Sequence, residues 1–278
     1  LSALMESGQT LLPSRIASNL DLLTNSLGTC VGAGIGLLLS HAFLEQSRLL
    51  TLRQRWFSTD AGRGLIVLAL WPAAQIYPQG YLFGHGQITT QLSETLSDWL
   101  VMPIDIGALL RGGAQLNAEQ YWLSETIITA CGLTGTVLTL LFLMRRLAPR
   151  GPLVLFMVGT TLALKTLATA LQFGPENAFT WLTPGAVGGL LISGFMLGGL
   201  YYTHPQAQRR LAIASFCIGL LLINLLPENP YFVATLQTWV QGKFLNFNGA
   251  AQFLSSAWPF LVLWFLLHPT HRLHVVPA

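Results

Sequence analysis

Five polar residues near the start of the chain have the types and spacing of a small functional cluster. Glu6 and Gln9 are three residues apart, so a helix would place both side chains on one face. Asp21 and Asn25 are four residues apart at the start of a long apolar stretch, and Arg15 precedes Asp21 by six residues. Because a lone carboxylate inside a membrane is costly, Arg15 is the natural partner of Asp21. The pattern predicts a ligand-binding site formed by these five side chains.

Three kinds of chemistry are open for this cluster. The simplest is a salt-bridged helix start that only fixes how the chain enters a membrane. The second is a polar pocket in which Arg15 binds an anionic or hydroxylated headgroup. The third is an acid–base site in which Glu6 or Asp21 carries a proton. The sequence names no catalytic residue, and an enzyme is the less favoured interpretation.

Other ionisable residues give weaker indications. Lys165 lies in the middle of an apolar stretch, where it would either face Glu125 or Glu176 inside the protein or extend to the membrane surface. His85 is flanked by glycines and is most simply a loop histidine. Three histidines at a spacing of three follow the last apolar stretch: His268, His271 and His274. That spacing suits metal ligation only weakly, so the sequence predicts neither a metal site nor a cofactor.

Seven long apolar stretches must position these residues, and each is near the roughly 20 residues that a helix needs to cross a bilayer. They are 20–40, 64–83, 122–144, 152–172, 180–202, 211–226 and 249–267. Two further segments, 87–101 and 230–245, carry apolar residues at helical spacing on one face, as helices lying on a membrane surface do. The sequence predicts an all-α, polytopic transmembrane helical bundle of about seven membrane-spanning helices and two interfacial amphipathic helices.

Basic residues collect in every second gap between the apolar stretches. The gap 79–121 holds only Arg111, together with four acidic residues. The basic gaps and the tail hold Arg48, Arg53, Arg55, Arg63, Arg145, Arg146, Arg150, Arg209, Arg210 and Arg272. Loops rich in arginine and lysine stay in the cytoplasm. The pattern therefore predicts a multi-pass protein of a bacterial cytoplasmic (inner) membrane, with its first residues outside and its C-terminus in the cytoplasm.

Composition excludes several classes of protein. Charged residues make up 9% of the chain and hydrophobic residues 52%, whereas a soluble domain carries roughly 25% charged residues. The net charge of +3 is explained by topology and gives no indication of a nucleic-acid partner. The three cysteines all lie in apolar stretches, which argues against a disulfide framework. The chain has no G-x-x-x-x-G-K-[ST] motif, so it is not itself an ATP-driven machine of the P-loop type.

The run E-S-G-Q-T-L-L-P-S-R-I-A-S-N-L-D-L-L-T-N-S-L-G-T-C-V-G resembles the C-terminal half of the VanZ-like family domain. The matching positions are Glu6, Gln9, Arg15, Asp21, Asn25, Gly28 and Gly32, within about 36 of the 278 residues. Residues 229–249 are similar to the C-terminal region of longer bacterial members. The family's domain normally begins with further helices that this chain lacks, which predicts a truncated start. The resemblance implies two parts: 1–40, the C-terminal half of a VanZ-like domain, and 41–278, an additional transmembrane helical region of the same membrane domain.

The family is named after a protein linked to glycopeptide resistance, and the resemblance implies a role in the cell envelope. We expect an integral inner-membrane protein that binds or handles an envelope component at the outer face, in an accessory or resistance-like role. Its expected partners are the lipid bilayer and a lipid-linked or peptidoglycan-related ligand. The alternative is a small-solute or lipid transporter, which would need a cavity that reaches the middle of the membrane near Lys165 and Pro184.

Overall fold

The computed structural model describes residues 27–28, 30–34, 48–112, 116–227 and 245–268. The regular elements in these ranges are helices, and a single isolated bridge pairs Phe57 with Met144. The chain divides into two compact units, 1–56 and 57–278. In the first unit, α3 (Arg48–Trp56) is a short helix with Arg53 and Arg55 in its last turn, where the negative end of the helix dipole favours them. The second unit is a helical bundle.

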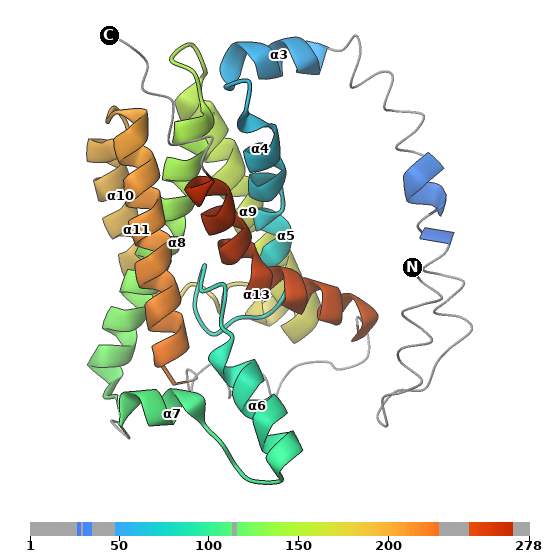
Figure 1. Ribbon diagram of the computed structural model, residues 1–278, viewed down its shortest axis with the longest axis vertical. Helices are drawn as coiled ribbons and strands as arrows, with labels where there is room; N and C mark the ends of the chain where they lie inside the picture. Colours follow the sequence, from blue (N-terminus) through green and yellow to red (C-terminus); the bar gives the residue numbers. More distant parts are fainter. Residues whose placement is uncertain (1–26, 29, 35–47, 113–115, 228–244, 269–278) are drawn as a thin grey trace. The chain divides into compact units, whose positions relative to one another are not determined.

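The bundle is built around α8 (Ala118–Leu143), which packs against both α10 (Pro184–Leu200) and α11 (Pro205–Leu225) (Figure 1). A capping box starts α8: Asn117 Oδ1 accepts from the backbone N–H of Gln120, and Gln120 Oε1 accepts from that of Asn117, both at 2.9 Å. The helix is apolar on all sides, as a helix enclosed by others must be. Small residues allow α10 to come close, since a Cβ at Gly189 would lie only 2.5 Å from Thr129 Cβ.

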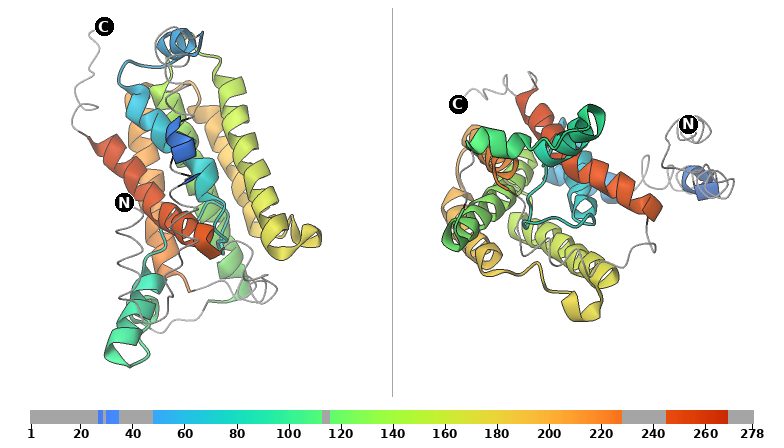
Figure 2. Two further views of the ribbon diagram at one scale, coloured as in Figure 1. Left: turned by 90° about the vertical axis from the view of Figure 1, so that its right-hand side faces the viewer. Right: turned by 90° about the horizontal axis from the view of Figure 1, so that it is seen from below.

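The remaining elements of the bundle surround this trio. They are α4 (Ala61–Ala69), α5 (Trp71–Ala74), α6 (Thr89–Leu100), α7 (Ile106–Arg111), α9 (Arg150–Phe173), the 3₁₀ turn η1 (Pro175–Asn177) and α13 (Leu245–Leu267). Figure 2 shows α13 crossing the bundle obliquely. Large apolar side chains stay exposed on the outward faces of α9 and α10, such as Phe156 and Phe195. An exposed apolar surface of this kind fits contact with lipid.

Four helices are long and apolar enough to cross a membrane: Ala118–Leu143, Arg150–Phe173, Pro205–Leu225 and Gly249–Leu267. The apolar helices Ala61–Ala74 and Pro184–Leu200 are shorter. The stretch 20–40 lies mostly outside the described residues. The all-helical prediction is therefore confirmed, and the number of seven spans is not.

The stretch 64–83 differs from its prediction. Helical structure ends at Ala74, and residues 75–88 continue through the interior of the bundle as non-helical backbone until α6 begins. We call residues 75–88 the broken segment. The predicted helix 87–101 is present as α6, whereas 230–245 lies almost entirely outside the described residues.

The broken segment is tolerated because four surrounding helices supply hydrogen bonds to its backbone. The carbonyls of Ile76, Leu82 and Gly86 accept from the side chains of Gln172 on α9 (2.8 Å), Thr129 on α8 (3.2 Å) and Asn224 on α11 (2.9 Å). The backbone N–H of Gly86 donates to the carbonyl of Ser255 on α13 at 3.2 Å. That carbonyl is free because Pro259, four residues on, has no N–H to donate.

Charge divides between the two ends of the bundle. The backbone N–H of Ser58 donates to the carbonyl of Leu143, which joins the start of α4 to the C-terminal end of α8. Arg209 Nε donates to the carbonyl of Leu266, which joins the beginning of α11 to the end of α13. These four helix ends lie at one end of the bundle (Figure 1). This basic end carries Arg63, Arg145, Arg146, Arg150, Arg209 and Arg210, with Asp60 at the start of α4. The opposite, acidic end holds α6, α7, the start of α8 and the end of α11. It carries Glu94, Asp98, Asp105, Glu119 and Glu176 with Arg111.

Candidate functional site

The five residues that the sequence analysis selected as a ligand site lie outside the described residues. Glu6, Gln9, Arg15, Asp21 and Asn25 all fall within 1–26. The proposed cluster therefore stays a prediction. The described part of the chain holds two other polar sites, one at the acidic end of the bundle and one in its interior.

The first site is a cavity of about 600 Å³ between α6, α7 and the end of α11, which we call the α6–α7 pocket. Two stripes of α6, each at a spacing of four residues, face it, because residues four apart share one side of a helix. These stripes are Thr89, Ser93 and Ser97, and Thr90, Glu94 and Asp98. The wall is completed by residues of the α6–α7 connection, of α7 and of the chain that follows α11: Ile104, Asp105, Gly107, Arg111, Leu226 and Pro227. Its volume is in the range of small-molecule sites.

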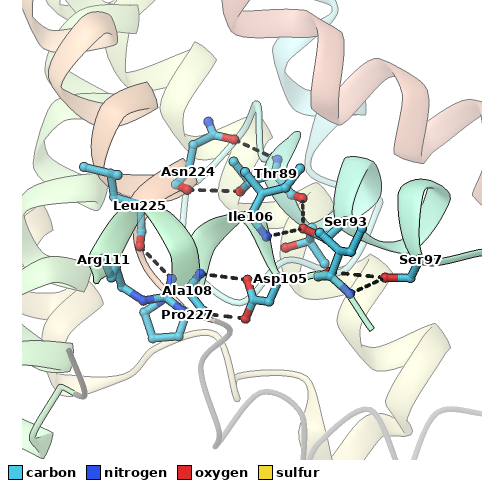
Figure 3. A network of polar contacts seen from close by, with 12 residues as sticks. Thr89, Ser93, Ser97, Asp105, Ile106, Ala108, Arg111, Asn224, Leu225 and Pro227 are labelled. Carbon is cyan, nitrogen blue, oxygen red and sulfur yellow. Dashed lines mark hydrogen bonds and ion pairs between the residues drawn. The ribbon is translucent and has the colours of Figure 1, made fainter. Parts of the chain in front are cut away.

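The serines of α6 hold α7 in place (Figure 3). Ser93 Oγ accepts the backbone N–H of Ile106 at 3.0 Å and donates to the Thr89 carbonyl at 2.6 Å. Ser97 Oγ accepts the N–H of Ile104 at 2.8 Å. Asp105 then caps α7 by accepting the N–H of Ala108 at 2.9 Å. The first stripe of α6 is thus used for structure. In the second stripe Thr90 Oγ1 accepts from Gln87 Nε2 at 3.0 Å, which leaves Glu94 and Asp98 to contact a ligand.

Asn224 joins the pocket to the end of α11 and to the broken segment (Figure 3). Its Oδ1 accepts the N–H groups of Ile88 at 2.8 Å and Thr89 at 3.1 Å, at the start of α6. Its Nδ2 donates to the carbonyls of Gly86 and Leu220, both at 2.9 Å. Thr89 Oγ1 returns a hydrogen bond to the Asn224 carbonyl at 3.0 Å. One amide therefore fixes both where the broken segment ends and where α6 begins.

The pocket has an excess of negative charge. Arg111 Nη1 donates to the Leu225 carbonyl at 2.7 Å, and its Nη2 lies 3.8 Å from Asp105 Oδ2. Glu94 and Asp98 are exposed, and no salt bridge joins either of them to another described residue. Three carboxylates and one guanidinium give the wall a formal charge of −2. This chemistry suits a ligand that carries ammonium or hydroxyl groups.

The second site lies inside the bundle, on and around the broken segment. The ring of His85 is 5% exposed, with Gln75 Nε2 at its Nε2 and Gln79 Nε2 at its Nδ1, the latter at 2.6 Å. Gln79 also donates to Ser255 Oγ on α13. Trp258 packs edge-on against the ring at a centroid distance of 5.4 Å. We call Gln75, Gln79, His85 and Ser255 the interior polar cluster.

Lys165 belongs to the surroundings of this cluster. It is 4% exposed and close enough for its charge to act on His85, so it does not extend to the membrane surface. Among the described residues it forms no ion pair and its ammonium has no hydrogen-bond partner. Neither Glu125 nor Glu176 pairs with it. Lys165 is therefore a buried cation without a carboxylate in the described part of the chain.

Glu125 has a different partner. Thr183 Oγ1 donates to its Oε1 at 2.5 Å, and the same hydroxyl accepts the N–H of Ala186 to cap α10. A Cβ at Gly185 would lie 2.4 Å from Glu125 Oε2. The carboxylate thus lies against the positive end of the α10 dipole, which stabilises a negative charge. Glu125 joins α8 to α10 and takes no part in the interior polar cluster.

A small cavity of about 20 Å³ adjoins His85 at the level of the middle of α8. Phe83, Gly132, Phe216 and Trp258 form much of its wall. Space of this size holds one water molecule. Among the described residues no group of three potential metal ligands occurs; of the histidine trio only His268 is described.

Of the residues at these sites, His85 and Lys165 stand out in the sequence as candidate functional residues, and the others do not. Asn224, Gln75 and Gln79 had one available signal, since each is an amide within or beside an apolar stretch, where a polar side chain needs a partner. Gln75 and Gln79 meet His85 within ten residues, whereas the partners of Asn224 at the start of α6 and the Ser255 partner of Gln79 are more than 130 residues away. Which amide meets which backbone group is set by the tertiary structure.

Comparisons with known proteins identify no relative from which a function could be transferred. No family model, no curated protein and no solved structure matches the chain.

Proposed function

We propose that the protein is an integral membrane protein that binds an amine-bearing or hydroxylated component of the cell envelope in the α6–α7 pocket. The observation that carries this proposal is the pocket itself, a cavity of about 600 Å³ with a formal charge of −2. Glu94 and Asp98 present carboxylates to it, and no salt bridge to another described residue holds them elsewhere. An ammonium group would form charge-assisted hydrogen bonds with the two carboxylates.

The distribution of charge supports an outer location for this pocket. Arginines gather at the basic end of the bundle, and the pocket lies at the acidic end. Under the positive-inside rule the basic end faces the cytoplasm. We infer an inner-membrane protein with its pocket at the outer surface and its C-terminus in the cytoplasm. In this topology the exposed apolar residues Trp99, Val101 and Met102 at the tip of α6 lie near the outer leaflet.

The described residues do not support the two other hypotheses from the sequence, the VanZ-like role and the transporter, to the same degree. The VanZ-like resemblance and its resistance-like role stay predictions, and the resemblance is carried mainly by residues 1–40. The count of seven spans, which rests on the apolar stretches of the sequence, is not confirmed. The transporter alternative gains no support from the cavity next to His85, because that cavity holds one water molecule and is lined by neither Lys165 nor Pro184. Binding at the acidic end is the function that the described geometry favours.

Native mass spectrometry of the detergent-purified full-length protein tests the proposal. We expect a bound envelope component with the wild type and its loss in the double variant Glu94→Gln, Asp98→Asn. Glu119→Gln is the matched control, since Glu119 is an exposed acid at the same end of the bundle that does not line the pocket. Retention of the component in all three proteins, or its absence from the wild type, would contradict the proposal.

A further inference from the structure

The interior polar cluster has hydrogen-bond donors that its own acceptors do not satisfy. A neutral imidazole has one donor and one acceptor nitrogen, yet both glutamines present Nε2 to the His85 ring. Amide nitrogen and oxygen are assigned from their hydrogen bonds, so one of the two amides must be turned. Gln79 already donates to both Nδ1 and Ser255 Oγ and is consistent as it stands. Gln75 therefore presents its oxygen to an Nε2–H of the ring.

This assignment moves the NH₂ group of Gln75 to a position without a partner. The Oε1 atom of Gln75 is buried and makes no hydrogen bond with the described residues. Once the amide is flipped, the NH₂ group occupies this position. The indole Nε1–H of Trp71 is also buried and unpaired. Lys165 adds an ammonium that is 4% exposed. The only acceptor of the cluster left unpaired is Gln79 Oε1, so donors outnumber acceptors.

These unpaired donors come from two helices that pack against each other. Trp71 and Gln75 are four residues apart on α5 and its C-terminal cap, and so lie on one side of it. Lys165 is on the buried face of α9, which packs on α5. No carboxylate of the described residues acts on Lys165. A cation enclosed in this way is costly unless an opposite charge accompanies it.

We propose that Lys165, Gln75 and Trp71 bind a single small monovalent anion of the halide class. The anion accepts from the ammonium, the amide NH₂ and the indole N–H, and its charge balances that of Lys165. Its size follows from the enclosure of its donors: Trp71 and Gln75 are 0% exposed and Lys165 is 4% exposed, which favours a monatomic ion over phosphate or sulfate. The cavity of about 20 Å³ beside His85 is a separate space that none of the three lines. The proposal does not depend on the α6–α7 pocket or on its ligand.

The thermal unfolding midpoint of the full-length protein in detergent provides the test. Chloride or bromide replaces gluconate at constant ionic strength, and we expect a saturable rise of the midpoint, since an anion that binds only the folded state stabilises it. Sulfate should produce no such rise. In Lys165→Met the apparent halide affinity should weaken at least about tenfold, because a charge-assisted hydrogen bond is lost. Arg210→Met, which removes an exposed arginine at the basic end, should leave the halide response unchanged.

A second variant keeps the test decisive if Lys165→Met does not fold. Gln75→Glu places a carboxylate at the end of α5, which packs against the helix that carries Lys165, so the variant should fold and its unfolding midpoint should no longer respond to halide. In the wild type, bromide should quench part of the tryptophan fluorescence saturably, and Trp71→Phe should remove that part. A wild type without a halide response, or a response that Gln75→Glu and Lys165→Met both retain, would overturn the proposal.

Discussion

At the scale of single residues, Asn224 combines more structural roles than its type suggests. Its side chain makes four hydrogen bonds, two to N–H groups at the start of α6 and two to carbonyls. It lies in the last turn of α11, where the sequence shows only one amide in an apolar run. The side chain replaces the hydrogen bonds that non-helical backbone enclosed by apolar helices cannot obtain from water.

Replacement of Asn224 by leucine should therefore destabilise the protein by about 2–4 kcal/mol, because backbone N–H groups lose their acceptor while partly buried. Asn177→Leu is the matched control: Asn177 makes one side-chain hydrogen bond, to the Phe173 carbonyl at 2.8 Å, and should cost about 1 kcal/mol. Reversible unfolding in mixed micelles measures both values. Equal losses for the two variants would show that Asn224 does not have the role described.

Gly86 is a second residue whose identity is set by its surroundings. Its φ is +86°, and a Cβ there would lie 2.4 Å from Leu220 Cδ2 and 2.7 Å from Pro259 Cγ. Gly86→Ala combines backbone strain of about 1–2 kcal/mol with overpacking of about 1–3 kcal/mol. Gly112 has a φ of +61° but open space, so Gly112→Ala should show the strain alone. The difference in unfolding free energy between the two variants isolates the packing contribution; if there is no difference, helices α11 and α13 do not enclose Gly86 closely.

At the scale of elements, the proline of α13 and the broken segment fit together. Pro259 leaves the Ser255 carbonyl without its usual helical donor, and the N–H of Gly86 fills that role at 3.2 Å. A proline within a membrane helix is tolerated when a neighbour satisfies the freed group. Here the neighbour is the broken segment, in which the backbone N–H of Gly86 needs an acceptor. The two irregularities compensate each other.

Pro259→Ala tests this pairing. The new N–H of residue 259 would compete for the Ser255 carbonyl, so the Gly86 amide should exchange its hydrogen faster than in the wild type, while the amides of α8 remain protected. Hydrogen exchange followed by mass spectrometry over peptides that contain 81–88 gives the measurement. Unchanged exchange in this peptide would mean that the Gly86 amide does not depend on the freed carbonyl.

Helices could be predicted from the sequence where the length of an apolar stretch is enough to define them. The stretches 122–144, 152–172, 211–226 and 249–267 coincide closely with α8, α9, α11 and α13, and amphipathic spacing located α6. The prediction of one helix over 64–83 was wrong beyond Ala74, because hydropathy measures how apolar the side chains are and does not show which groups satisfy the backbone hydrogen bonds. Two of those partners, Gln172 and Asn224, are more than 90 residues away in the sequence, and Thr129 is 47 residues away. The wall of the α6–α7 pocket lies mostly within residues 89–111, but the packing of α7 on α6 and the contribution of Leu226 and Pro227 are set by tertiary structure.

At the scale of the whole molecule, the charge pattern and the packing agree. Every second gap in the sequence is rich in arginine, and the hydrogen bonds that join Ser58 to Leu143 and Arg209 to Leu266 bring several of these gaps to one end of the bundle. The α6–α7 pocket lies at the other end. A bundle with its arginines gathered at one end has a preferred orientation in a membrane. The orientation decides which compartment supplies the ligand of the pocket.

Cysteine labelling of intact cells tests this orientation. In a background without Cys30, Cys131 and Cys217, single cysteines would replace Met102, 62% exposed at the tip of α6, and Leu147, 78% exposed at the basic end. A maleimide that cannot cross bilayers should label position 102 in intact cells and position 147 only after permeabilisation, and the permeabilised sample controls for the reactivity of both thiols. The opposite pattern would place the α6–α7 pocket in the cytoplasm. An envelope ligand could not reach it there, although the halide site in the interior would be unaffected.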